Sequence, residues 1–288
     1  MTFNDNARIN PDKVSRRGRG KGIAIGGGST LLVIGLFIAS QLLGIDLTGL
    51  AGGGSAGGEQ QQDQALSECT TSEAANNSTD CRIAGAADSL DTYWASQVEG
   101  YRTTEVVLFT SQISTGCGGA TSASGPFYCP PDETIYVDTA FYDDLRTRFG
   151  STGGPLAEMY VIAHEWAHHI QNSTGIMDGI DRQATGPSSD SVRLELQADC
   201  FAGAWVGAAS TITDDDGVVF LDPVTDAQIA DALNAASAIG DDRIQESTQG
   251  QVTPETWTHG SSDKRQQWFT TGLNGGPSAC NTFEVATP

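Results

Sequence analysis

The chain is poor in basic residues and in histidine, and it lacks closely spaced cysteines. It has 15 Lys and Arg against 36 Asp and Glu, a formal net charge of −21, and 4 histidines. A domain this acidic repels phosphate backbones, so we expect no nucleic-acid partner. None of the 6 cysteines forms a CxxC pair, which excludes a zinc ribbon and a thioredoxin-like motif. The 288 residues are enough to bury a core, and their composition is not that of a collagen, a coiled coil or a disordered chain.

One long apolar run stands near the N-terminus. Residues 23–45 carry no charge and could cross a bilayer of about 30 Å as a helix. Basic residues crowd the first 21 positions, so the positive-inside rule places residues 1–21 in the cytoplasm as a basic tail. The sequence therefore predicts a single-pass cell-membrane protein with a transmembrane anchor at 22–45, an N-terminus in the cytoplasm and an extracytoplasmic domain. The alternative is a cleaved signal peptide, although its apolar core would normally span only about 7–15 residues.

A linker and one folded domain are expected after this anchor. Residues 46–65 are rich in Gly and Gln and cannot form a core, so the domain should occupy 66–288. We expect an α+β fold, mostly helical with a small mixed sheet. Strand signals cover residues 105–110 and 134–138, with a loop over 116–131 between them. Helix signals cover residues 84–96, 140–149, 155–172, 189–209, 226–239 and 262–271.

The even number of cysteines favours disulfide bonds in an exported domain. Six cysteines permit fifteen pairings, and the sequence alone does not choose among them. Pairing each cysteine with its neighbour along the chain gives Cys69–Cys81, Cys117–Cys129 and Cys200–Cys280.

The motif that carries chemistry is His164-Glu165-Trp166-Ala167-His168. Residues four apart on a helix share a face, so both imidazoles can reach one zinc ion at about 2.0–2.1 Å. Glu165, beside that face, can take a proton from water that the metal activates. His169 points about 100° away from His168 and is expected either beside the ligands, without binding the metal, or on the surface. The surrounding helix is apolar, and polar groups buried in it need partners, which favours a metal site. The alternative is a pair of core histidines that are satisfied within a structural network.

A catalytic zinc commonly takes three protein ligands and leaves one position for water. The next suitable group along the chain is Glu195, and Asp199 lies four residues further on the same helix face. We expect Glu195 to bind the metal and Asp199 to accept the second N–H of a ligand histidine. A solvated acidic face is the alternative, although residues 198–205 are too apolar for an exposed helix.

The sequence resembles the bacterial neutral zinc metallopeptidase family, within the gluzincin class. The resemblance lies in HEWAHHIQ, ELQADCFAGAW, GPFYCPPDETIYVD, AIGDDRIQ and the stretch around THGSSDKRQQWF, and so covers nearly the whole domain. It implies a zincin-like domain, peptidase chemistry, and the same roles for Glu195 and Asp199. Gluzincins often use a late histidine to stabilise the oxyanion, a role that matches His259. A loop histidine that caps the following helix is the alternative for that residue.

Two functions from different classes fit these residues. The first is a zinc-dependent peptidase, more an endopeptidase than an exopeptidase, that binds one Zn2+ per chain and cleaves envelope or secreted proteins. The second is a membrane-anchored scaffold with a structural zinc. A structural zinc would need a fourth protein ligand, and no cysteine lies at a suitable spacing from the histidines.

Overall fold

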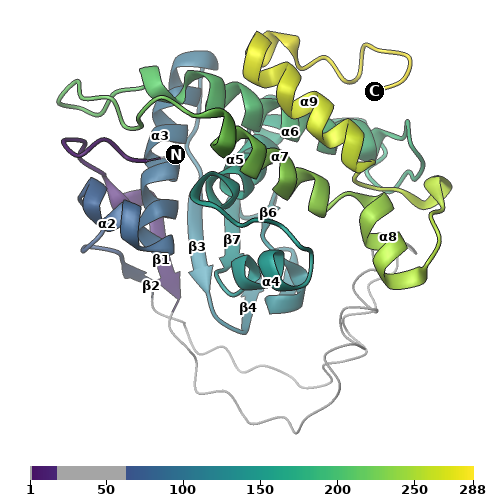
Figure 1. Ribbon diagram of the computed structural model, residues 1–288, viewed down its shortest axis with the longest axis horizontal. Helices are drawn as coiled ribbons and strands as arrows, with labels where there is room; N and C mark the ends of the chain where they lie inside the picture. Colours follow the sequence, from purple (N-terminus) through teal and green to yellow (C-terminus); the bar gives the residue numbers. More distant parts are fainter. Residues whose placement is uncertain (1, 18–62) are drawn as a thin grey trace, which may run out of the picture.

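The computed structural model describes residues 2–17 and 63–288 (Figure 1). The predicted anchor at 22–45 lies outside this part of the chain, as does most of the linker predicted over residues 46–65. The linker was wrong for its last three residues, Asp63–Ala65, because they pair with the N-terminal segment as strand β2. Within the described ranges, no helix is both long and apolar enough to span a bilayer.

A five-stranded mixed sheet lies at one side of the helices (Figure 1). Its order is β2-β1-β3-β7-β6. The central strand β3 runs parallel to both of its neighbours, and the two outer pairs are antiparallel. The strands are β1 (Val14–Arg17), β2 (Asp63–Ala65), β3 (Glu105–Phe109), β6 (Phe127–Cys129) and β7 (Thr134–Asp138). The mixed sheet and the helices confirm the α+β class.

Both faces of β3 are buried, each against a different partner. Successive side chains of a strand point to opposite faces of its sheet. Val106 and Leu108 therefore join the main core with the helices, whereas Val107 and Phe109 face a hairpin. This hairpin consists of β4 (Gln112–Thr115) and β5 (Gly118–Thr121). The loop expected over residues 116–131 was therefore wrong in part, since it contains β5 and β6.

The helix that carries the two motif histidines lies at the centre of the helical layer. This helix, α5 (Pro155–Ser173), packs against α3 (Thr79–Gln97), α6 (Asp190–Ala208) and α7 (Asp226–Ala238). It begins with a proline at its first position, where the missing N–H costs nothing. The other α-helices in the described part of the chain are α2 (Ser72–Asn77), α4 (Phe141–Thr147), α8 (Asp241–Gln249) and α9 (Ser262–Gly275).

Helices α6 and α9 touch backbone to backbone. A Cβ atom at Gly272 would lie 1.8 Å from the carbonyl oxygen of Cys200, and one at Gly203 would lie 2.0 Å from that of Phe269. Only glycine permits so close an approach. The contact holds the C-terminal helix α9 against the helix that carries Glu195.

All three disulfides obtained by pairing neighbouring cysteines are present. Cys69–Cys81 joins the start of α3 to the preceding segment, and Cys117–Cys129 ties the hairpin to β6. Cys200–Cys280 links α6 to the C-terminal tail across 80 residues.

The N-terminal residues differ most from the sequence-based expectation. Residues 1–21 were expected to form a separate basic tail, but residues 2–17 pack into the domain, beside α2 and α3 (Figure 1). Phe3, Ile9 and Val14 are buried in the main core, and β1 pairs with β3. The domain therefore does not begin at Leu66, because burial of these apolar side chains holds the N-terminal segment against the domain.

Candidate metal centre

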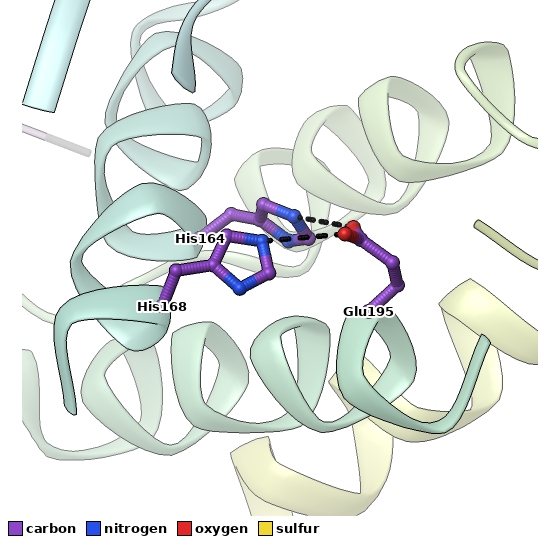
Figure 2. Close-up of side chains that lie close together, drawn as sticks. All are labelled: His164, His168 and Glu195. Atoms are coloured by element: carbon purple, nitrogen blue, oxygen red, sulfur yellow. Dashed lines mark hydrogen bonds and ion pairs between the residues drawn. The ribbon is translucent and has the colours of Figure 1, made fainter. Parts of the chain in front are cut away.

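Three side chains converge between α5 and α6 (Figure 2). His164 and His168 lie one turn apart on α5 and turn their rings toward Glu195 on α6. The Nε2 atom of His164 lies 3.0 Å from Oε2 of Glu195, and Nε2 of His168 lies 3.5 Å from Oε1. The ligand atoms of the three residues all lie within 4.8 Å of one another. The structure thus brings together the three residues that the sequence predicts as ligands.

This donor set fits zinc. Two imidazole nitrogens and one carboxylate oxygen are borderline ligands of the kind that zinc takes, and three protein ligands leave one coordination position for water. Both imidazoles are largely buried, which limits competition from water. Among the described residues, this is the only group of three His, Cys, Asp or Glu side chains that is close enough to hold a metal ion.

Hydrogen bonds fix which nitrogen of each ring faces the cluster. His164 donates from Nδ1 to Oδ1 of Asp199 at 2.9 Å, and His168 donates from Nδ1 to Oε1 of Gln171 at 2.8 Å. The Gln171 amide nitrogen in turn donates to the carbonyl of Leu194, on α6. Each ring therefore presents its Nε2 toward Glu195 and holds its other nitrogen in a hydrogen bond, an arrangement that suits a metal ligand.

Asp199 is fully buried, and its charge is balanced by several partners. The Arg265 guanidinium donates from Nε to Oδ2 at 2.8 Å and from Nη2 to Oδ1 at 3.0 Å. The Tyr160 hydroxyl also donates to Oδ1. Burial alone would raise the pKa of Asp199, but Arg265 and His164 outweigh it and lower the pKa to about 2. The carboxylate therefore stays ionised and holds His164.

The buried carboxylates favour positive charge at the cluster. Burial alone would lower the pKa of His164, but Asp199 and Glu195 outweigh it and raise the pKa to about 10. Burial would likewise raise the pKa of Glu195, yet His168 and His164 hold it well below its usual value. Either protonated imidazole or a divalent cation supplies the charge that this arrangement requires.

Glu165 is buried beside the ligand His164 on α5. Within the described residues, its carboxylate makes no hydrogen bond or ion pair with the protein. A buried carboxylate without a protein partner is costly unless water or a ligand solvates it. The Glu165 oxygens are not among the buried side-chain atoms that lack a partner, so the carboxylate is open to solvent, whereas Asp199 is fully engaged.

His259 lies in the loop before α9, where an aspartate organises the backbone. Oδ2 of Asp241 accepts the N–H groups of Thr258, His259 and Gly260 at 2.7–2.9 Å. Nδ1 of His259 lies 3.3 Å from Oδ1 of the same aspartate, and 43% of the histidine side chain is exposed. Burial would lower the pKa of His259, but Asp241 and Glu195 outweigh it and raise it. The negative charge of Glu195 therefore acts on His259, although the contacts of the ring are with its own loop and Asp241.

His169 lies outside the cluster, as its position on the helix predicts. Its Nε2 donates to the carbonyl of Arg102 at 2.7 Å, and its Nδ1 lies 3.1 Å from the hydroxyl of Tyr128 on β6. The side chain is fully buried. His169 therefore ties α5 to the edge strand of the sheet.

Sequence reasoning missed four residues. Tyr160 and Arg265 hold Asp199, Gln171 holds His168, and Asp241 holds the loop of His259. Tyr160 stands four residues before His164, and Gln171 stands three after His168, so helical spacing was a usable signal for both. Asp241 and Arg265 lie in the quoted stretches AIGDDRIQ and DKRQQWF. Nothing in those stretches by themselves indicates what the two side chains contact.

Comparisons with known proteins agree with this geometry. A family model described as "Putative neutral zinc metallopeptidase" matches residues 3–283. "Uncharacterized protein Rv2575" of Mycobacterium tuberculosis is 49% identical over 223 residues, which cover 77% of this chain and 76% of that protein. "Uncharacterized protein YpfJ" of Escherichia coli K12 is 38% identical over 275 residues, which cover 93% of this chain and 91% of that protein. No solved structure matches.

Proposed function

Because the chain belongs to the family of neutral zinc metallopeptidases, we propose that it hydrolyses internal peptide bonds of proteins with one zinc ion per chain. The observation that carries this proposal is the convergence of His164, His168 and Glu195, with Glu165 beside them and unengaged by the protein. Three ligands and a free carboxylate are the elements that metal-assisted hydrolysis requires.

The side chains take distinct roles in this mechanism. His164, His168 and Glu195 would hold zinc, which when bound acts as a Lewis acid and lowers the pKa of water toward about 7. Glu165 accepts a proton from the attacking water and delivers it to the leaving amine.

His259 stabilises the negative charge that develops on the substrate carbonyl oxygen. Its Nδ1 side faces Asp241, whose negative charge favours the protonated ring, and in that form Nε2–H is free to donate a hydrogen bond to the oxyanion. Asp241 fixes this ring and the backbone of its loop, so the donor is held in place before the substrate binds.

The alternative function, a scaffold around a structural zinc, has less support. A structural site normally has four protein ligands, whereas the group in the described part of the chain offers three. A scaffold would also have no use for a buried Glu165 without a protein partner.

A comparison of three variants tests the mechanism. Glu165→Gln keeps the side-chain size but cannot accept a proton, so zinc content should stay the same and cleavage should fall by about 10²–10⁴. Glu195→Gln should lower both zinc content and cleavage, because it removes an anionic ligand. The exposed Glu246→Gln is the control and should match the parent. Zinc content and the cleavage of peptides with blocked termini are measured side by side, and cleavage by Glu165→Gln at the parental rate would refute the mechanism.

We further propose that the domain works outside the cytoplasm, on envelope or secreted proteins. Three disulfides support this location, because disulfides persist in oxidising compartments. A single crossing of the membrane by residues 22–45, as the sequence predicts, would separate residues 2–17 from the domain. The expected cytoplasmic N-terminus conflicts with the β1–β3 pairing, so we place residues 2–17 on the same side as the domain.

Cysteine labelling tests this placement. Asn6 and Glu246 are both exposed, and each is replaced by cysteine in a separate variant. A membrane-impermeant maleimide applied to intact spheroplasts should label both variants. If residue 246 were labelled and residue 6 were protected, the N-terminus would lie in the cytoplasm and the placement proposed above would be wrong.

A further inference from the structure

We propose that Arg265 is a positioning residue that holds the metal ligand His164 and the loop of His259 in one fixed geometry. The inference rests on the proposed function, but it concerns only this chain's own contacts. Arg265 is 1% exposed and lies on α9, far along the chain from the two α5 ligands. It belongs neither to the ligand set nor to the groups that transfer protons.

The first set of contacts runs from Arg265 through Asp199 to His164. Two guanidinium nitrogens bind the two oxygens of Asp199 at 2.8 and 3.0 Å, a fork that fixes the plane of the carboxylate. Oδ1 of this carboxylate accepts the Nδ1–H of His164 at 2.9 Å. The direction in which His164 presents its Nε2 therefore depends on the plane that Arg265 sets.

Tyr160 completes this arrangement from the helix of the ligands. Its hydroxyl donates to Oδ1 of Asp199 and accepts a hydrogen bond from Nη2 of Arg265 at 3.2 Å. Asp199 is thus held from α5 and α9 at once, and it has no free rotation about its carboxyl group.

The second set of contacts runs from Arg265 toward His259. Nη1 of Arg265 donates to the carbonyl of Ile239 at 3.2 Å. Ile239 caps the C-terminal end of α7, two residues before Asp241, which anchors the His259 loop through its backbone N–H groups. One guanidinium therefore touches both the carboxylate that orients the ligand and the segment that orients the oxyanion donor.

Helix α9 is itself held so that Arg265 cannot drift. Oγ of its first residue, Ser262, lies 2.8 Å from the carbonyl oxygen of Ser237 and 2.7 Å from Oδ1 of Asp242, and its single proton is shared between these two acceptors. Its far end contacts α6 through Gly272. A lysine at position 265 would keep a positive charge, but an ammonium group cannot reproduce the planar fork.

Four variants test the inference: Arg265→Lys, Arg265→Met, Tyr160→Phe and the control Arg82→Met. Arg82 is also buried, and its guanidinium lies 2.6 Å from the carboxylate of Glu158. This ion pair does not involve the metal ligands. We measure zinc affinity by chelator competition, the absorption spectrum of the cobalt-substituted protein, kcat and KM for a peptide, and the thermal midpoint.

Arg265→Lys should lower zinc affinity by about 10–100-fold, the usual effect of losing a group that orients a ligand, and should change the cobalt spectrum. Tyr160→Phe should change both in the same direction but less, and both variants should lower kcat more than they change KM. Arg265→Met should show the largest loss, and the partial recovery with Lys separates charge from fork geometry. Arg82→Met should lower the thermal midpoint alone and leave zinc affinity and spectrum as in the parent.

Parental zinc affinity and cobalt spectrum in Arg265→Lys and Tyr160→Phe would overturn the inference. So would an equal loss of zinc affinity in Arg82→Met, since the effect would then reflect stability alone. If Arg265→Met does not fold, the Lys and Phe variants decide the outcome. A parent protein that binds zinc but cleaves no peptide would refute the proposed function and leave this test intact.

Discussion

The close contact between α6 and α9 predicts how far one substitution, Gly272→Ala, would move the two helices apart. A Cβ atom at Gly272 would meet the carbonyl oxygen of Cys200 at 1.8 Å, about 1.6 Å short of ordinary contact, which begins near 3.4 Å. The atom it meets belongs to the backbone of α6, so no side-chain rotation relieves the clash. Gly272→Ala must therefore push the two helices apart.

The cost follows from two opposing effects. Overpacking typically destabilises by about 1–3 kcal/mol, and a backbone clash of this size belongs at the upper end. Alanine recovers at most about 1 kcal/mol through its better helix propensity. We expect the free energy of unfolding to fall by about 2 kcal/mol, which lowers Tm by about 4–8 °C in a domain of this size.

Calorimetry and zinc titration together test this reasoning. Gly119→Ala is the control, because a Cβ there meets nothing within 4 Å and the residue has no positive φ. The Gly272→Ala variant should also bind zinc more weakly, because the displaced α9 would move Arg265 away from Asp199. If Gly272→Ala matched Gly119→Ala in both Tm and zinc affinity, the backbone contact would not determine the geometry of the site.

Two further predictions concern the packing of the N-terminal segment. Burial raises the pKa of Asp88 to about 6, so the folded state binds its proton more tightly and loses stability as pH rises from about 4 to about 6. The groups facing Asp88 are the amide of Asn10 and the side chains of Lys13, Asp91 and Asp215. After allowance for solvent screening, Asp88→Asn should therefore raise the free energy of unfolding by about 1–2 kcal/mol at pH 7 and leave it unchanged at pH 4. Equal effects at the two pH values in urea titrations would contradict this prediction. Gly85→Ala places a Cβ 2.5 Å from the Phe3 ring and should expose residues 2–17 to limited proteolysis, and unchanged protection would show that Phe3 does not hold the segment.

Local signals were sufficient for the long helices and the central strands. Helix α5 begins at Pro155, where it was expected, and α6 begins one residue after the expected position, behind Ser189, whose side chain accepts the N–H of Val192. Strands β3 and β7 are short runs of β-branched and aromatic residues, which the strand pattern identifies directly. Caps and periodicity act over a few residues, so a single sequence contains them.

The rest of the sheet depends on partners that are distant in sequence. Strand β1 contains Arg16 and Arg17 and has no alternating pattern that would identify it as a strand. Strand β6 has three residues in a stretch whose Gly, Cys and Pro content indicates a loop. Both exist because β3 and β7 offer unpaired edges, and such tertiary pairing overrides local propensity.

The candidate ligands could be predicted because their spacing lies within single helices. The residue that supports them from another helix could not. His164 and His168 share a helix face, as do Glu195 and Asp199, so spacing alone placed each pair. Arg265 lies 66 residues from Asp199, and no local pattern distinguishes it from other cations on the chain. The candidate ligands are encoded within single helices, whereas the position of Arg265 beside Asp199 depends on how two helices pack.

The same distinction bears on the orientation of the chain at the membrane. The positive-inside rule reads charge near an apolar run and assumes that the preceding segment is free to stay in the cytoplasm. Arg17 and Asp63 lie opposite each other in the β1–β2 pair, so the chain leaves and re-enters the domain at one edge of the sheet. Burial of Phe3, Ile9 and Val14 contributes about 1.5–3 kcal/mol for each side chain, together comparable with the whole stability of an ordinary domain. A cytoplasmic N-terminus would forfeit this burial and open the edge of β3, so the sheet is the stronger argument for the side on which residues 2–17 lie.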